Sequence, residues 1–404
     1  MAAHLSDSQN GVLKFIKTPK PFEPVTTMPM RILHIAPQNI SDVPMTLVRA
    51  ERALGHDSRL VTFYRDPRGY DEDMCLELPL VRSVAVQRLK RWVSDPQRQR
   101  VDNSARVTGE GPPVWRPHSA AERWLVALRE RLWQRKIERW MQEVDFWNFD
   151  VYEFDAGLDF YRDGRIVRRL KQAGKRIIVA YTGSDLRTRG IIPAVDAAAD
   201  LRITFEWDHL DLDDSLMHVL FPFEPERFAF RIREARSRPV RIGHAPTNRA
   251  AKGSDVILAV LQQLQTERDI EIVLIEHLPY REAIARKDTC DIFIDQIGDL
   301  GYGINALEAL ALGIPTCTGL VPAFKRAYPD HPFVEVDRRN LKDALLALID
   351  DAARRSRLAE QGRRWLERHH DSRAIVQRIH RALEERSQET ATTQAKTTLS
   401  GNEE

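Results

Sequence analysis

The sequence of 404 residues is poor in cysteine, with only Cys75, Cys290 and Cys317. They form neither a CxxC pair nor an even-numbered framework, which argues against a disulfide-stapled secreted domain and against structural zinc. Cys290 and Cys317 lie in apolar, strand-like runs, where a free cysteine packs as a small hydrophobic residue. The cysteine pattern therefore fits a protein of the reducing cytosol.

Long apolar runs are also missing. No stretch reaches the roughly 18 apolar residues that a transmembrane helix needs. Residues 1–28 are polar and proline-punctuated, without the apolar core of a secretory signal, and are predicted to be disordered or extended. Residues 387–404 contain no aromatic and almost no branched aliphatic side chain, which predicts a disordered tail. We expect a soluble, cytoplasmic protein.

An excess of charge of one sign is absent, because 61 basic residues face 59 acidic ones. The balance gives no case for a nucleic-acid partner, and any membrane contact must come from a local patch. No GxGxxG follows the first predicted strand, which argues against a nicotinamide or flavin cofactor. A DxD pattern occurs within residues 211–215, but it lacks the strand context of a metal site. We therefore predict neither cofactor nor metal.

Short β-branched runs alternate with helical patterns along most of the chain, which is typical of parallel sheets with crossover helices. The first series is MRILHIA, SRLVTFY, FDVYEF, KRIIVAYTG and LRITFE. After a charged, proline-bounded stretch the series restarts with VRIGHAP, IEIVLIE, CDIFIDQ and IPTCTG. The restart predicts two doubly wound α/β domains, at 29–221 and 240–386, joined by a linker at 222–239.

Residues 82–141 do not fit the alternation and predict a helical insertion in the first domain. Its apolar stripe consists of Trp124, Leu128, Leu132 and Ile137, with Trp133 and Trp140 beside it. We favour a helix pair that packs on the first domain, because several glutamates share the second helix. The alternative is a basic amphipathic helix that makes a weak contact with a membrane surface.

Candidate functional residues follow the predicted strands, where doubly wound sheets bind their ligands. After VRIGHAP comes TNRAAKG, which supplies Arg249 and Lys252 at a strand-to-helix junction. Cations beside a helix N-terminus suit a phosphate group. The alternative is that Arg249 and Lys252 are solvated loop charges and that His244 is a packed or capping side chain.

The segment GYGINALEALALGIPTC follows CDIFIDQ in the same way. Gly301 and Gly303 allow close backbone approach, and the following helix carries one carboxylate, Glu308, among apolar residues. A buried carboxylate is costly without a polar partner, so Glu308 should meet solvent, a partner or a ligand such as a ribose diol. The alternative is a first-turn partner of the helix dipole. Gly313 and Pro315 predict the end of this helix.

Together, AAKGSDVILAVLQQL, IFIDQIGDLGYGINALEALALGIPTC and PFEPERF resemble the retaining GT-B glycosyltransferases of family 4, also called group 1. The resemblance covers most of residues 221–320 and continues more thinly into the first domain, through HIAPQNISDVPMTLVRAERALGHDSRLV and VAYTGSDLR. It implies the GT-B architecture, two Rossmann-like domains facing a central cleft. The implied reaction is metal-independent transfer of a hexosyl unit from a nucleoside diphosphate sugar to a hydroxyl, with retention of configuration.

The resemblance also implies residue roles. Glu308 would hold the ribose, Lys252 and Arg249 the diphosphate, and Gly303 with Ile304 the pyrophosphate through backbone N–H groups. Lys252, Arg249 and Asp185 are the expected catalytic residues. The other expected donor-side residues are Tyr302, Asn305, Asp299, His244 and Thr247. Ser184 and Asn39 are expected on the acceptor side, although Ser184 or Asp185 could instead cap the following short helix.

Several positions depart from the family pattern. Leu300 stands where the family's first glutamate is expected, with Asp299 as a possible substitute, and Gln38, Asn39 and Ile40 replace the usual glycine pair. Glu153, Asp155 and Thr182 stand where relatives often have histidines. These departures leave open a catalytically inactive GT-B-like subunit that binds a nucleotide or a partner, and an epimerase. The acceptor class (glycan, lipid-linked or small molecule), the base, the sugar and the oligomeric state stay open; glycoconjugate or polysaccharide assembly is the implied setting.

Overall fold

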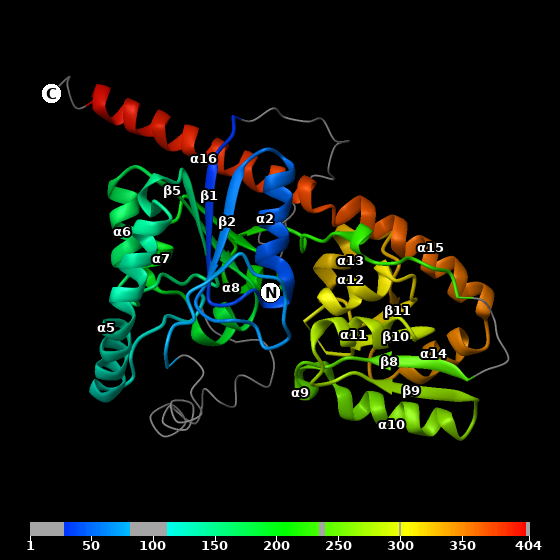
Figure 1. Ribbon diagram of the computed structural model, residues 1–404. Coiled ribbons are helices and arrows are strands. Elements are labelled where there is room, and N and C mark those ends of the chain that lie inside the picture. Colours follow the sequence, from blue (N-terminus) through cyan, green and yellow to red (C-terminus); the bar gives the residue numbers. More distant parts are fainter. Residues whose placement is uncertain (1–27, 81–110, 234–238, 299, 401–404) are drawn as a thin grey trace, which may run out of the picture.

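Two parallel β-sheets organise the molecule, as Figure 1 shows. The computed structural model describes residues 28–80, 111–233, 239–298 and 300–400. The first sheet has seven strands in the order β3-β2-β1-β4-β5-β6-β7, and the second has five in the order β12-β11-β10-β8-β9. Every strand pairing in both sheets is parallel. The prediction of two doubly wound α/β domains is confirmed.

The first domain contains β1 to β7 and the helices between them. Its strands are β1 (Arg31–Ala36), β2 (Asp57–Thr62), β3 (Met74–Cys75), β4 (Val151–Asp155), β5 (Arg176–Tyr181), β6 (Leu201–Thr204) and β7 (Met217–His218). Its α-helices are α2 (Val43–Ala53), α5 (Ala120–Glu143), α6 (Arg165–Gln172), α7 (Pro193–Asp196) and α8 (His209–Leu212). Single short turns lie at Ile40–Asp42, Phe146–Asn148 and Asp185–Arg189.

The second domain follows one further turn, Pro225–Arg227. Its strands are β8 (Val240–His244), β9 (Ile270–Leu274), β10 (Ile292–Gln296), β11 (Thr316–Thr318) and β12 (Val334–Glu335). Its helices are α9 (Arg249–Lys252), α10 (Ser254–Gln265), α11 (Tyr280–Lys287), α12 (Ile304–Ala311), α13 (Pro322–Ala327), α14 (Leu341–Ile349) and α15 (Ala352–His369). As predicted, α12 stops before Gly313, whose φ of 76° suits glycine.

The central strands are buried on both faces, which explains why their sequences are almost continuously apolar. In β1, Ile32 packs in a cluster with α2, and Leu33 packs on the opposite face with α5 and α6. The second sheet is covered in the same way by α10 and α14 on one face and by α11 and α12 on the other. Cys290 and Cys317 are fully buried in these cores, as predicted.

The last helix, α16 (Ser372–Ser400), leaves the second domain and crosses the first, as Figure 1 shows in red. Its buried Ile375, Val376, Ile379 and Leu383 join the apolar cluster that contains Leu47 of α2. The same cluster extends to Leu307 of α12. A single apolar core thus connects the two domains.

The predicted disordered tail is wrong over residues 387–400, because α16 continues to Ser400. Extending an existing helix requires no new nucleation, and the helix formers Gln388, Glu389 and Lys396 favour propagation. Of the predicted N-terminal segment 1–28, residues 1–27 lie outside the described residues, as do 401–404 of the tail.

Helix α5 shows how the predicted insertion meets the first domain; residues 81–110 lie outside the described part. Trp133, Ile137 and Trp140 are buried, whereas Trp124 and Leu132 are 64% and 51% exposed. The packed face therefore follows the i, i+4, i+7 spacing of Trp133, Ile137 and Trp140. Of the predicted stripe, Ile137 packs, whereas Trp124, Leu128 and Leu132 are exposed. No helix among the described residues combines the length and apolar content needed to cross a membrane.

Candidate functional site

The carboxyl-terminal ends of β8 and β10 bring Lys252 close to the start of α12. The Lys252 Nζ atom lies 2.6 Å from Oδ1 of Asp295, a fully buried residue of β10. The other Asp295 oxygen accepts a hydrogen bond from the backbone N–H of Gly303 at 3.0 Å. Asp295 therefore holds both the lysine and the residue before α12, and the Lys252 side chain remains 18% exposed.

Glu308 lies on α12, the same helix whose start lies beside Lys252. Its carboxylate pairs with Lys287 at the end of α11, and both side chains are almost completely buried. Lys287 also donates to the Oδ1 atom of Asn305 at 2.7 Å. The sequence predicted that Glu308 needs a polar partner, and Lys287 is that partner. Lys287 was missed because nothing in its local sequence marks it as buried.

Arg249 and Thr247 lie at the open end of the site. The Arg249 guanidinium is about half exposed, and its Nε atom lies 2.8 Å from Glu276, which follows β9. This pairing lowers the pKa of Glu276 below its usual value. Thr247 is exposed in the loop between β8 and α9. Both residues remain accessible to a ligand.

Three residues predicted to contact ligand are enclosed in the protein. His244 is fully buried, with Nδ1 against the Ile294 carbonyl and Nε2 against Ser254 Oγ, both at 2.8 Å. Tyr302 packs on Phe333, and its hydroxyl meets His370 at 3.2 Å. These predicted donor contacts are wrong, because the side chains point into the core and their polar atoms are already bonded.

Asn39 gives the third correction. It is fully buried, and its amide donates to Asp42 and to the Asp71 carbonyl while its oxygen accepts from the backbone of Met45. An acceptor-side contact is therefore not available. Gly303 needs a narrower correction, since its N–H already bonds Asp295 and is not free for a pyrophosphate. Ile304, half-buried, begins α12.

On the first domain, Ser184 and Asp185 follow β5. Both Asp185 oxygens accept backbone N–H groups, from Thr182 at 2.8 Å and Gly183 at 2.6 Å. Asp185 therefore holds the loop that precedes its short helix, and the expected alternative, a side-chain cap of that helix, does not form. Ser184 is exposed beside it. Asp299 lies outside the described residues.

A loop of the first domain reaches the second domain next to Glu308. The backbone N–H of Tyr280, the first residue of α11, donates to the Arg68 carbonyl at 2.8 Å, and the rings of Tyr70 and Tyr280 lie 4.5 Å apart. Burial, followed by the negative charge of Glu308, raises the pKa of both tyrosines. Sequence reasoning missed these residues, because only the fold brings them to Glu308.

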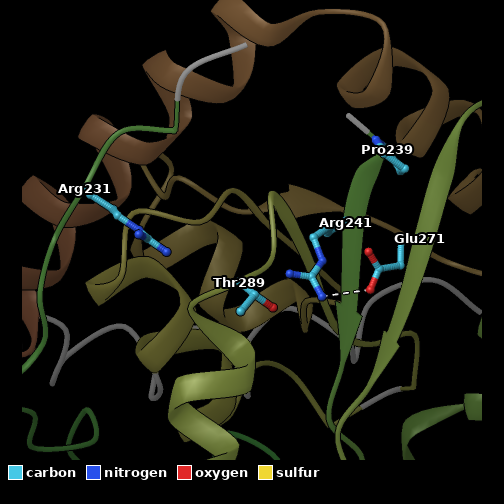
Figure 2. A pocket seen from close by; sticks show the side chains of 5 residues that line it. All are labelled: Arg231, Pro239, Arg241, Glu271 and Thr289. Atoms are coloured by element: carbon cyan, nitrogen blue, oxygen red, sulfur yellow. Dashed lines mark hydrogen bonds and ion pairs between the residues drawn. The ribbon is translucent and has the colours of Figure 1, made fainter. Parts of the chain in front are cut away.

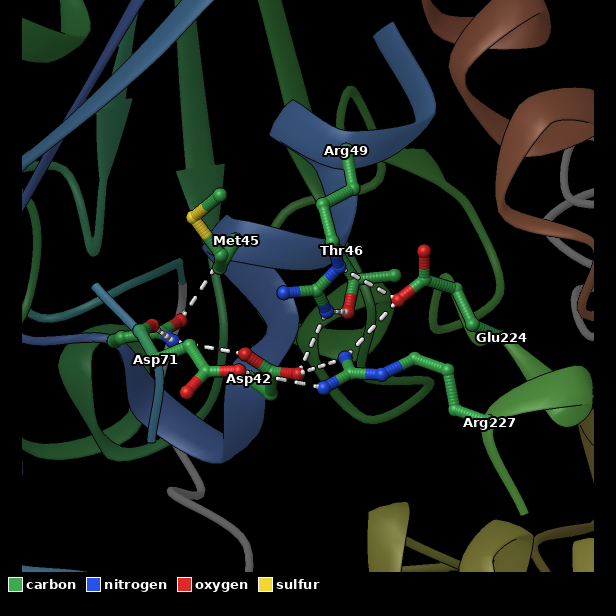
Figure 3. Close-up of polar contacts among 8 residues, drawn as sticks. Asp42, Met45, Thr46, Arg49, Asp71, Glu224 and Arg227 are labelled. Carbon is green, nitrogen blue, oxygen red and sulfur yellow. Dashed lines mark hydrogen bonds and ion pairs between the residues drawn. The ribbon is translucent and has the colours of Figure 1, made fainter. Parts of the chain in front are cut away.

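A network of charges joins the same loop region to the linker (Figure 3). Asp42 accepts from Arg49 at 2.6 Å and from Arg227 at 2.7 Å, and Glu224 pairs with both arginines. Arg227 also lies 3.6 Å from Asp71. The start of α2 and the segment between the domains are thus held in one orientation.

Two surface hollows differ in position. The larger, of about 360 Å³, is lined by Arg231, Arg241 and Glu271 at the amino-terminal ends of β8 and β9 (Figure 2). Ligands of doubly wound sheets bind at the opposite edge, so this hollow does not fit a substrate site. A second hollow of about 200 Å³ is lined by Ile297, Gly319 and neighbours after β10 and β11. It adjoins the Lys252 turn, because the Ile297 N–H bonds the Lys252 carbonyl.

A separate group of buried ionisable side chains lies within the first domain. It comprises His34, Glu51, Glu153, Asp155 and His380. Burial opposes charge on His34, but Glu51 and Glu153 raise the pKa of its imidazole well above the usual value. Burial and the neighbouring Glu153 raise the pKa of Asp155. His34, Glu153 and Asp155 place ligand atoms within 4.8 Å of one another.

Comparison with solved structures identifies the fold. Over 88% of this chain, the structure is similar to sucrose-phosphate synthase from Thermosynechococcus elongatus (98% of that chain, TM-score 0.53, 12% identity). It is also similar to a glycosyltransferase from Rickettsia africae (98% of that chain, TM-score 0.52, 11% identity) and to Anabaena HepE in complex with UDP-glucose (all of that chain, TM-score 0.51, 11% identity). No family model and no curated protein matches the sequence. The chain therefore has the GT-B fold, as expected, and the likeness at this identity shows the fold alone.

Proposed function

We propose that the protein is a glycosyltransferase that moves a hexosyl unit from a nucleoside diphosphate sugar to a hydroxyl acceptor, with retention of configuration. The observation that carries the proposal is the position of Lys252 against the start of α12, which bears Glu308. This arrangement lies at the carboxyl-terminal edge of a parallel sheet, where such folds bind ligands. The GT-B neighbours include a complex with UDP-glucose.

The diphosphate would bind between Lys252 and the half-exposed Arg249. When the sugar leaves, negative charge develops on the β-phosphate, and preorganised cations stabilise that charge without a metal at this position. Lys252 would exchange part of its contact with Asp295 for the phosphate. Because Asp295 also holds Gly303, it would keep the lysine and the helix start aligned.

Glu308 would accept a hydrogen bond from the ribose while Lys287 holds its other side. The hollow next to Ile297 and Gly319 offers space beside the Lys252 turn for a further part of the donor. Ser184 and the neighbouring loop after β5 would face the acceptor, which we propose to be a glycan, a lipid-linked sugar or a small molecule.

The test replaces Lys252 by glutamine, which keeps a donor for Asp295 but removes the charge. We expect turnover of the productive donor, found by screening nucleoside diphosphate sugars, to fall by about 10²- to 10³-fold with little change in melting temperature. The control is Lys342→Gln, since Lys342 pairs with Glu267 just before β9, at the opposite edge of the sheet from Lys252. Equal turnover of Lys252→Gln and wild type would refute the assignment.

The rival is a GT-B subunit that binds a nucleotide or a partner without catalysis. It is favoured by the internal pairing of Lys252, Glu308 and Gly303, which leaves fewer groups free for chemistry. Slow hydrolysis of the donor separates the two: a transferase releases free sugar from its donor, whereas an inert subunit binds the donor and leaves it whole.

A further inference from the structure

His34, Glu153 and Asp155 form a compact group on one face of the first sheet. His34 lies on β1 and is in register with Glu153 on the adjacent β4. Asp155 lies two residues further along β4, so its side chain points to the same face. All three side chains are at most 3% exposed, beneath α2 and α16. The group lies in the first domain and has no part in the proposed donor site.

The atoms of this group that face one another are one imidazole nitrogen and two carboxyl oxygens. The Nδ1 atom of His34 lies 3.5 Å from Glu153 Oε1 and 4.0 Å from Asp155 Oδ2. Among the described residues, none of these atoms has a hydrogen-bond partner, nor does Asp155 Oδ1. No described lysine or arginine forms an ion pair with Glu153 or Asp155. Burying carboxylates in this way is costly unless a cation compensates them.

The far side of His34 is fixed by a carboxylate. Its Nε2 atom lies 2.8 Å from Glu51 Oε2, and Glu51 is held in turn by Ser58 Oγ at 2.6 Å and His380 Nε2 at 3.0 Å. A neutral histidine that donates one N–H to a carboxylate presents its other nitrogen as a lone pair. Metal-binding histidines are oriented by this kind of outer contact.

We propose that His34, Glu153 and Asp155 bind one divalent transition-metal ion, and that Zn²⁺ fits this set of one imidazole nitrogen and two carboxylates. Two ligands of one Zn²⁺ ion can lie at most about 4.4 Å apart, given bonds of about 2.0 to 2.2 Å. The ligand atoms here lie within 4.8 Å, so small side-chain rotations suffice. The two carboxylate charges balance the charge of the ion.

The ion would act as a structural tie. It would connect β1 to β4, and through Glu51 it would connect both strands to α2 and to His380 of α16. The inference goes beyond the proposed transfer reaction and differs from the sequence-based expectation that the chain binds no metal. It also does not depend on that reaction, because the donor phosphates are assigned to Lys252 and Arg249.

The first experiment measures metal content and stability of the full chain. After purification without chelator, elemental analysis should find about one Zn²⁺ or Mn²⁺ per chain. After dialysis against EDTA, the melting temperature should fall, and added Zn²⁺, Mn²⁺ or Co²⁺ should restore it in a saturable way. Co²⁺ should also give visible absorption bands of a bound ion. Absence of metal together with no shift on adding any of the three ions would overturn the proposal.

The second experiment places the site. Asp155→Asn and Glu153→Gln should each lower the bound metal at least tenfold and remove the metal-dependent shift in melting temperature. The control is Asp211→Asn, an exposed carboxylate of the DxD pattern, which should keep both. If a substitution prevents folding, the Co²⁺ spectrum of the wild-type chain decides, because a bound imidazole and carboxylates differ from a hydrated ion. Metal that remains after both substitutions would overturn the assignment.

Discussion

The two domains bury carboxylates in contrasting ways. In the second domain, Asp295 and Glu308 each meet a lysine, so each buried negative charge has a partner of opposite sign. In the first domain, Glu153 and Asp155 face an imidazole, and Glu153 Oε1 and both Asp155 oxygens have no hydrogen-bond partner within the described ranges. In the second domain each buried carboxylate is therefore already paired, and the partly exposed Lys252 can also pair with a ligand. In the first domain the carboxyl groups lack such a partner, and the proposed metal ion would supply it.

The largest expected effect comes from breaking the buried pair of Glu308 and Lys287. Glu308→Gln leaves the buried Lys287 charge without its carboxylate, so the free energy of unfolding should fall by about 3–5 kcal/mol. Chemical denaturation measures this change. The double variant Glu308→Leu with Lys287→Met should recover most of the stability but not donor binding. Recovery of both would show that Glu308 serves only the fold.

In the first domain, substituting a buried carboxylate should raise the free energy of unfolding instead of lowering it. With EDTA present, Asp155→Asn supplies an amide donor to Glu153 and replaces a buried carboxyl group whose oxygens have no hydrogen-bond partner among the described residues. The free energy of unfolding should therefore rise by about 1–3 kcal/mol under metal-free conditions. Denaturation of both proteins in EDTA gives the difference. A loss as large as that of Glu308→Gln would mean that the two sites do not differ as described.

Lowering the pH should destabilise the protein through buried imidazoles that face neutral groups, unlike His34, which faces carboxylates. His370 is fully buried against the Phe221 carbonyl and the Tyr302 hydroxyl, and burial lowers its pKa to about 3. Between its unfolded pKa of about 6.5 and this value, only the unfolded chain binds the proton, so stability falls as pH falls.

The expected loss from His370 is about 2 kcal/mol between pH 7 and pH 5, at about 1.4 kcal/mol per pH unit below 6.5. Denaturation curves at several pH values measure it. In His370→Gln this part of the pH dependence should disappear. An unchanged slope would show that His370 is protonated in the folded protein.

The smallest expected effect concerns the contact between the domains. Tyr70→Ala removes the ring contact with Tyr280 and should lower the free energy of unfolding by about 1 kcal/mol. The Tyr280 amide, which bonds the Arg68 carbonyl, should then exchange its hydrogen faster. Tyr70→Phe keeps the ring and serves as the control. Equal exchange in all three proteins would show that the ring pair does not hold this contact.

Sequence reasoning predicted the two sheets well, because strands buried on both faces have a strong apolar signal. It also predicted that Glu308 needs a partner, but Lys287 lies 21 residues away and only packing brings it there. His244 and Asn39 were misassigned for a related reason: both come at strand ends or just beyond, where the sequence does not show which side chains are already bonded. Conversely, the i, i+2 spacing of Glu153 and Asp155 could have placed both on one sheet face.

The path of α16 has a consequence for how the protein is made. The face of α2 that holds Leu47 is covered by side chains of α16, and Glu51 on the same helix hydrogen-bonds to His380 of α16. During synthesis the first domain is therefore translated early, yet its apolar face stays open until α16 emerges. A ribosome stalled before α16 would present that apolar face to chaperones.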